Sequence, residues 1–183
     1  IVAFKNQVVE LGGHEGATTN NRMEITAILE ALLFCLEKHS KETSQNTSQD
    51  TCEIKILTDS VYVIRGITQW IHGWKKREWK NAENEPVSNK DLWIDLDRVV
   101  SQIKAKSFTL SWNYIKGHSG VLGNERCDEI AVAFSKHNYI SLYNDKLTSY
   151  FFNIDELPEI RPLPEMKSAS QKQTSSTSWY LSY

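Results

Sequence analysis

The order of apolar and polar positions along the chain predicts a pair of short strands followed by a helix. Strand-like runs at 1–4 and 7–11 are joined by a tight turn. Asn21 and Glu24 have the offset of a capping box, which predicts a helix start at this point. Apolar residues then recur at helical spacing: Met23, Ala27, Ile28, Ala31, Leu32, Cys35 and Leu36.

Strands and helices continue to alternate in the second half of the chain. Residues 53–58 alternate as a strand, and Asp59-Ser60 can end it and cap a helix that closes near Gly66. The later elements are an amphipathic helix at 91–103, a strand at 108–114 and a helix capped by Asn124 that ends near 135. This order predicts an α/β layered fold with a mixed sheet flanked by helices.

We expect this domain to occupy residues 1–140. Residues 141–178 have the composition of an extension and a linker, with prolines at 158, 162 and 164. Residues 179–183 are abruptly apolar, and we interpret them as the start of a second, truncated domain. The first residue, Ile1, opens directly into strand-like sequence, so we also expect the chain to be clipped at its N-terminus.

Composition adds few constraints. The formal net charge is −2, so any affinity for nucleic acid must come from a local patch. The cysteines, Cys35, Cys52 and Cys127, lack metal-binding or redox spacing and are typical of free thiols in a reducing compartment. Without a signal peptide or a long apolar run, we expect a cytoplasmic monomer with no membrane contact and no evident protein partner.

Three carboxylates occupy positions at the starts and ends of the expected elements, namely Glu24, Asp59 and Asp128. Clustered carboxylates repel one another unless cations lie between them, and hard oxygen ligands suit Mg²⁺. Each residue also has a purely structural explanation. Glu24 could only close its capping box, Asp59 could only cap its helix, and Asp128 could be one more solvated charge.

A segment that alternates tryptophans with cations follows the second of these carboxylates. Trp70, Trp74 and Trp79 alternate with Lys75, Lys76, Arg77 and Lys80. Cations attract the phosphate backbone and aromatic rings pack on sugars or bases, so the segment could bind nucleic acid. The alternative is a helix whose tryptophans are core and whose cations are solvated.

Six ordered motifs together resemble type 1 ribonuclease H of the cellular type, which carries a basic protrusion. They lie at 18–24, 57–60, 67–77, 91–93, 116–120 and 124–129. The resemblance covers residues 1–137 and implies an endonuclease that cuts the RNA strand of RNA/DNA hybrids. It also implies two Mg²⁺ ions, with Mn²⁺ as the alternative, and products with a 5′-phosphate and a 3′-hydroxyl.

The resemblance implies a role for each matching residue. Glu24, Asp59 and Asp128 match three of the family's four metal-binding carboxylates, and His118 matches a mobile histidine that handles protons or helps product leave. The resemblance also implies residues that bind the hybrid. Thr19 and Asn89 match positions that hold a phosphate of the DNA strand, and Asn20 and Asn21 match residues that contact the minor groove. The residues of the protrusion that would contact the DNA strand are Trp70, Trp74, Lys75, Lys76 and Arg77.

The chain departs from the family pattern at its start. The family's first strand, which is central in the sheet and ends in the fourth aspartate, has no counterpart here, so we expect poor folding and little nuclease activity. One alternative is therefore a module that binds hybrid without cutting it. Another is a nuclease or integrase domain of a mobile element, against which the cellular-type protrusion and the loop at 116–120 argue.

Overall fold

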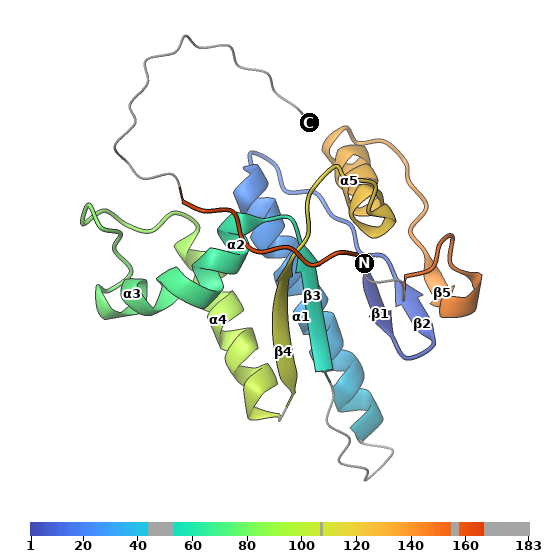
Figure 1. The fold of residues 1–183 in the computed structure, drawn as a ribbon, viewed down its shortest axis with the longest axis horizontal. Coiled ribbons are helices and arrows are strands. Elements are labelled where there is room, and N and C mark those ends of the chain that lie inside the picture. Colours follow the sequence, from blue (N-terminus) through green and yellow to red (C-terminus); the bar gives the residue numbers. More distant parts are fainter. Residues whose placement is uncertain (44–52, 107, 155–157, 167–183) are drawn as a thin grey trace.

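The computed structural model describes residues 1–43, 53–106, 108–154 and 158–166 (Figure 1). Its strands form two sheets. The antiparallel sheet has the order β1-β2-β5, with β1 at Val2–Phe4, β2 at Gln7–Val9 and β5 at Asn144–Lys146. The second sheet is a parallel pair, β3 at Glu53–Thr58 and β4 at Thr109–Tyr114, in which Ile56 lies opposite Trp112.

The expected α/β class is confirmed, but the strands form two separate sheets and not one mixed sheet. We expected a mixed sheet whose central strand is absent from this chain. Among the described residues, no strand pairs with both β1 and β3, so the antiparallel and parallel strands remain separate. In Figure 1, β3 lies near the middle of the molecule and β1 to its right, and the two strands belong to separate sheets.

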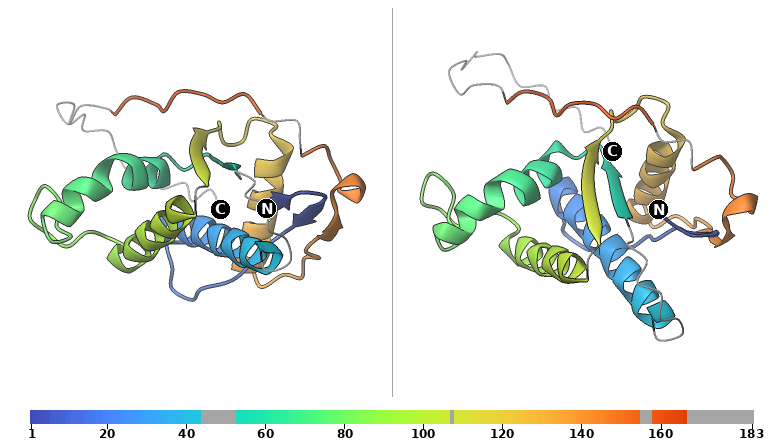
Figure 2. Two further views of the ribbon diagram at one scale, coloured as in Figure 1. Left: turned by 90° about the horizontal axis from the view of Figure 1, so that it is seen from below. Right: turned by 60° about the horizontal axis from the view of Figure 1, so that its bottom comes forward.

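Helices contain more of the described residues than strands do. They are α1 at Asn20–Thr43, α2 at Val61–Arg65, the π-helical η1 at Gly66–Trp70, α3 at Ile71–Lys76, α4 at Lys90–Ala105, α5 at Leu122–Ser135 and the 3₁₀ turn η2 at Leu147–Ser149. The views in Figure 2 keep α1 and α4 on the same side of the β3–β4 pair. No helix in the described ranges is both long enough and apolar enough to cross a membrane.

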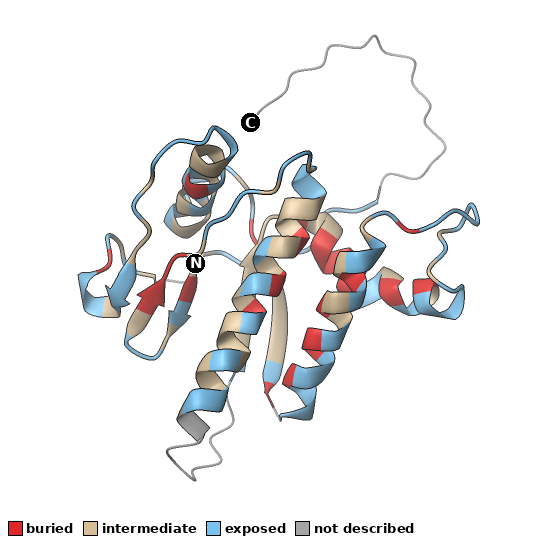
Figure 3. Ribbon diagram, turned by 180° about the vertical axis from the view of Figure 1, so that it is seen from behind, coloured by how far each residue is buried: buried red, intermediate tan, exposed pale blue. Residues whose placement is uncertain are grey.

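The main core lies between α1, α4 and the parallel strands. Ile25 and Leu32 of α1 meet Trp93, Leu96 and Ile103 of α4, and all five are almost completely buried. Figure 3 shows buried segments along both α1 and α4. The apolar face predicted from residue 23 onward is correct only in part. Leu32 is buried, and Ile28 and Leu36 pack against the core. The prediction missed Ile25 and Leu29, which are buried, and it included Ala27, which is exposed.

The start of α1 differs from the expected capping box. The helix begins at Asn20, and the hydroxyl of Thr19 accepts a hydrogen bond from the backbone N–H of Arg22, 3.3 Å away. Thr19 is therefore the capping residue, since its side chain satisfies a donor in the first turn. The prediction that Asn21 and Glu24 form a capping box was wrong, because the carboxylate of Glu24 accepts from the Ser60 hydroxyl instead.

Other predicted helix boundaries agree with the structure only in part. Of the predicted Asp59-Ser60 pair, Ser60 is the residue that caps α2, because its hydroxyl accepts the Val63 N–H. The helix does not close at Gly66, because α2 runs on through η1 into α3. Asn124 does not cap the last helix either, since α5 already begins at Leu122.

The chain after residue 140 packs on the domain. Strand β5 pairs with β2, with Asp145 opposite Val8. Farther along, the Arg161 N–H donates to the Tyr114 carbonyl at 3.0 Å, and the Arg65 guanidinium donates to the Pro164 carbonyl. The segment at 179–183, which we interpreted as the start of another domain, lies outside the described residues.

Candidate functional site

The three predicted carboxylates converge beyond the carboxyl end of β3. Asp59 follows that strand, Glu24 comes from the second turn of α1, and Asp128 comes from α5. Burial raises the pKa of Glu24, and the nearby Asp59 carboxylate raises it further. Burial also raises the pKa of Asp128, again with a contribution from Asp59. Asp59 therefore lies close enough to repel both of the other carboxylates.

Neighbouring polar groups hold two of these carboxylates in place. The Ser60 hydroxyl donates to Glu24 Oε2, and Asn124 Nδ2 donates to Asp59 Oδ2 at 3.3 Å. Gly117 lies so close to Asp59 that a Cβ at this position would overlap Oδ2. The loop after β4 thus needs glycine to approach the site.

Sequence reasoning assigned Ser60 and Asn124 only helix-capping roles and did not predict their contacts with the carboxylates. The sequence nevertheless contained a signal for both contacts, since Ser60 follows Asp59 directly and Asn124 precedes Asp128 by one turn of α5. A polar residue adjacent to a candidate metal ligand in a short motif is a signal for a supporting contact.

His118 lies beside the third carboxylate. Its Nδ1 is 3.4 Å from Asp128 Oδ2, and its side chain is 83% exposed. The backbone of His118 has a φ of 50°, in the left-handed region. Asp128 Oδ2 is itself buried and has no hydrogen-bond partner in the part of the chain that the structure describes. A buried oxygen of this kind is available to a cation or to a protonated imidazole.

Asp59 interacts electrostatically with each of the other two carboxylates. Within the described ranges, no three His, Cys, Asp or Glu side chains are grouped tightly enough to hold one ion by themselves. Paired carboxylates fit an ion that keeps several waters and takes further oxygens from a phosphate, which is the coordination that Mg²⁺ prefers. The donor set is therefore compatible with a divalent cation shared with a substrate.

A clamp centred on Arg22 joins the beginnings of α1 and α4. Its Nη1 and Nη2 donate to the two oxygens of Asp91 at 3.0 and 2.8 Å, and its Nε contacts Glu15 at 3.1 Å. The clamp brings the exposed Asn20 and Asn21 towards the end of α4 that follows Asn89. Arg22 and Asp91 each lie within one of the six motifs, but the sequence did not predict their contact.

Asn89 and Thr19 already have structural partners. Asn89 has a φ of 57°, and its Nδ2 donates to the Tyr62 hydroxyl at 3.4 Å. The Thr19 hydroxyl is the helix cap described above. A phosphate at either residue would therefore have to share these polar groups.

The tryptophan and cation segment divides between core and surface. Trp74 is only 9% exposed, and its ring centroid lies 5.4 Å from that of Trp93. The core alternative therefore holds for Trp74, whereas Trp70 is half-buried. Lys75, Lys76 and Arg77 are exposed, although Lys75 contacts Asp97 at 2.7 Å.

Fold and site together define an α/β domain with an acidic cluster at a strand end and a cationic helix nearby. A family model described as RNase H matches residues 1–136. Ribonuclease H of Thermosynechococcus vestitus is 45% identical over 135 residues, which cover 74% of this chain and 75% of the relative. Ribonuclease H of Klebsiella pneumoniae subsp. pneumoniae is 49% identical over 120 residues, or 66% of each chain. The chain belongs to the RNase H family, as its six motifs indicated.

A solved structure is also similar. It is that of a foamy viral protease-reverse transcriptase in complex with RNA/DNA hybrid, with 18% identity and a TM-score of 0.49. The similarity covers 67% of this chain and 15% of the viral chain.

Proposed function

We propose that this protein is an endonuclease that hydrolyses the RNA strand of RNA/DNA hybrids. The observation that carries the proposal is the position of Asp59 between Glu24 and Asp128 in a chain of the RNase H family. Carboxylates that repel one another at the end of a strand are a common basis for cation-assisted phosphodiester cleavage.

The three carboxylates would hold two Mg²⁺ ions, with Mn²⁺ as the alternative. The buried, unpartnered Oδ2 of Asp128 and the raised pKa values of Glu24 and Asp128 both support a cation at this place. Bound ions would supply an activated water and stabilise the leaving 3′-oxygen, so that the products carry a 5′-phosphate and a 3′-hydroxyl.

The chain's own residues prepare this site. The Ser60 hydroxyl orients the Glu24 carboxylate, and the Asn124 amide orients that of Asp59. His118 lies on an exposed loop within 3.4 Å of Asp128, where its imidazole can take or give a proton or help product leave.

Hybrid binding would use the surface around the Arg22 clamp and the exposed face of α3. We propose that Asn20 and Asn21 contact the minor groove, where the 2′-hydroxyl distinguishes RNA from DNA. Thr19 and Asn89 would hold a phosphate of the DNA strand. Trp70, with Lys75, Lys76 and Arg77, would grip that strand farther along.

We further propose that the protein works as a monomer in the cytoplasm. Cys35 and Cys127 are free thiols, as a reducing compartment would keep them.

The second candidate function is a module that binds hybrid without cutting it. The observation that favours it is the lack, within the described ranges, of three closely grouped ligand side chains.

Cleavage of end-labelled RNA in a hybrid, with Mg²⁺, separates the two candidates. The chain is compared with Asp59→Asn and with a matched control, Asp95→Asn, whose carboxylate pairs with Arg98 on the exposed side of α4. Cutting that is lost in Asp59→Asn and retained in Asp95→Asn supports the nuclease. Binding without cutting supports the module, and neither binding nor cutting overturns both.

A further inference from the structure

Helix α5 carries Asp128 but buries little apolar surface. The structure describes every residue of this helix, and Ile130 is the only one that is buried. None of its side chains belongs to the main core or packs against it. Figure 3 shows the contrast with α4, whose buried positions follow one side along its length. Apolar packing alone therefore gives α5 a weak hold.

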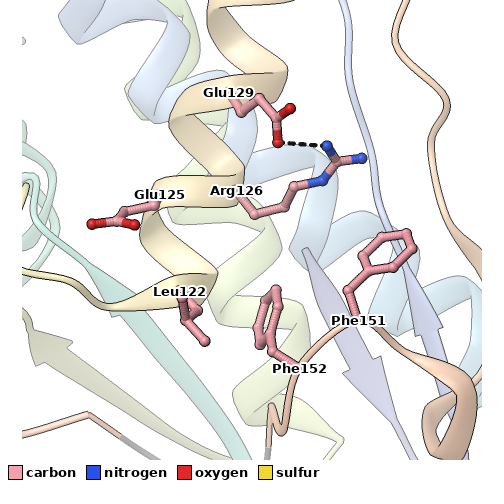
Figure 4. A pocket seen from close by; sticks show the side chains of 6 residues that line it. All are labelled: Leu122, Glu125, Arg126, Glu129, Phe151 and Phe152. Carbon is pink, nitrogen blue, oxygen red and sulfur yellow. Dashed lines mark hydrogen bonds and ion pairs between the residues drawn. The ribbon is translucent and has the colours of Figure 1, made fainter.

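A buried ion pair also holds this helix. Arg126 of α5 donates through Nε to Glu10 Oε1 and through Nη2 to Oε2, both at 2.8 Å. The Glu10 side chain is completely buried just after β2, and that of Arg126 is 15% exposed. Two parallel bonds of this kind fix both distance and orientation. In Figure 4, Arg126 leaves α5 towards Phe151, with its guanidinium also paired to Glu129.

The extension after residue 140 completes the partners of the same carboxylate. The Tyr150 hydroxyl donates to Glu10 Oε1 at 2.7 Å, and the backbone N–H of Tyr143 donates to Oε2 at 2.9 Å. Burial alone would raise the pKa of Glu10, but these bonds and those from Arg126 lower it to about 2. The carboxylate therefore stays charged and joins β2, α5 and the extension.

We propose that Tyr150 is a positioning residue for Asp128, acting through Glu10 and Arg126. Arg126 and Asp128 are two residues apart, so their side chains leave α5 on nearly opposite sides. The contacts among Tyr150, Glu10 and Arg126 hold one side of the helix, while Asp128 faces Asp59 on the other side. Tyr150 lies beyond the residues that the family model matches, so part of the support for the acidic site comes from outside the matched region. This role rests on the function proposed above.

The test compares two tyrosines of the same extension. Tyr150→Phe removes the hydroxyl that reaches Glu10, whereas Tyr143→Phe removes one that donates to the Lys146 carbonyl. Arg126→Lys is a second variant, which keeps the charge but loses the two-pronged contact. Mn²⁺ affinity of the full chain is measured by electron paramagnetic resonance of the free ion, at a temperature where melting curves show each variant folded. Hybrid cleavage against Mn²⁺ concentration is recorded in parallel.

We expect Tyr150→Phe and Arg126→Lys to weaken Mn²⁺ binding about 10-fold, as losses of outer contacts at metal sites do, and Tyr143→Phe to leave it unchanged. Variants that melt lower but bind Mn²⁺ like the parent would overturn the proposal, because the network would then be only structural. An equal loss in Tyr143→Phe would overturn the route through Glu10. A parent chain that neither binds Mn²⁺ nor cuts hybrid would overturn the proposed function itself, and the positioning role with it.

Discussion

The two sides of the acidic site are built from different forces. On one side, α1 and β3 carry Glu24 and Asp59 and pack with α4 around a core of buried aliphatic residues and Trp93. On the other side, α5 carries Asp128, buries little apolar surface and is joined to β2 by the Glu10–Arg126 pair. Apolar burial spreads stability over many weak contacts, whereas a buried ion pair concentrates it in a few directional ones. The relative position of the carboxylates thus depends on both kinds of contact.

The largest expected effect is on the apolar side. Trp93→Ala removes a fully buried ring from the centre of the core, and we expect the free energy of unfolding to fall by about 3–5 kcal/mol. Urea unfolding followed by circular dichroism measures this loss. The control is Ile94→Ala, the next residue of α4, which is 40% exposed and should cost less than about 1 kcal/mol. Equal losses for the two variants would show that this core does not dominate stability.

Glu10→Gln is the corresponding change on the polar side. The amide keeps the shape but leaves Arg126 with less opposing charge, and its NH₂ group faces other donors, so we expect a loss of about 2–3 kcal/mol. Glu129→Gln is the matched control, because Glu129 pairs with the same arginine but is 63% exposed. It should cost less than about 1 kcal/mol. The comparison between the two regions fails if urea unfolding gives similar losses for both changes.

Acid should weaken the polar side selectively. The pKa of Glu10 is about 2 in the folded chain against 4.5 as its ordinary value, so its stabilising contribution is complete above pH 4.5 and is lost as the pH falls towards 2. The difference in unfolding free energy between the parent and Glu10→Gln should therefore shrink by about 2 kcal/mol over this range. Taking the difference removes the contributions of the other carboxylates. A difference that stays constant with pH would contradict the assignment.

How much the sequence predicts also differs between the two regions. The apolar side follows largely from local patterns. Alternation predicted the strand at 53–58 with its bounds, and helical spacing predicted α1 and the buried Leu32, although it missed Ile25 and Leu29. The polar side does not. Glu10 and Arg126 are 116 positions apart, and each alone has the pattern of an ordinary surface charge. Nothing local shows that these two charges meet in a buried site or that Tyr150 joins them.

The sequence motifs predicted the three carboxylates of the candidate site but not the polar contacts that support them. Glu24, Asp59 and Asp128 do converge, but the Ser60 and Asn124 contacts depend on how α1, α2 and α5 approach one another. Trp74 could not be assigned correctly from its motif, because tryptophans at helical spacing beside cations are equally compatible with a core and with a binding surface. Only the packing against Trp93 decides between these alternatives.

The smallest expected effect concerns the start of α1, where local structure adds to a side already held by its core. Thr19→Ala removes the hydroxyl that caps the helix, and we expect a loss of about 1 kcal/mol by urea unfolding. Asn21→Ala is the control, because Asn21 lies inside the first turn of α1 and not at the cap. We expect this substitution to change the free energy of unfolding by less than about 0.5 kcal/mol. The reverse order would restore Asn21 as the cap. A much larger loss in Thr19→Ala would show that α1 relies on its end contacts as α5 does, so that the apolar and polar sides of the site would no longer be distinct.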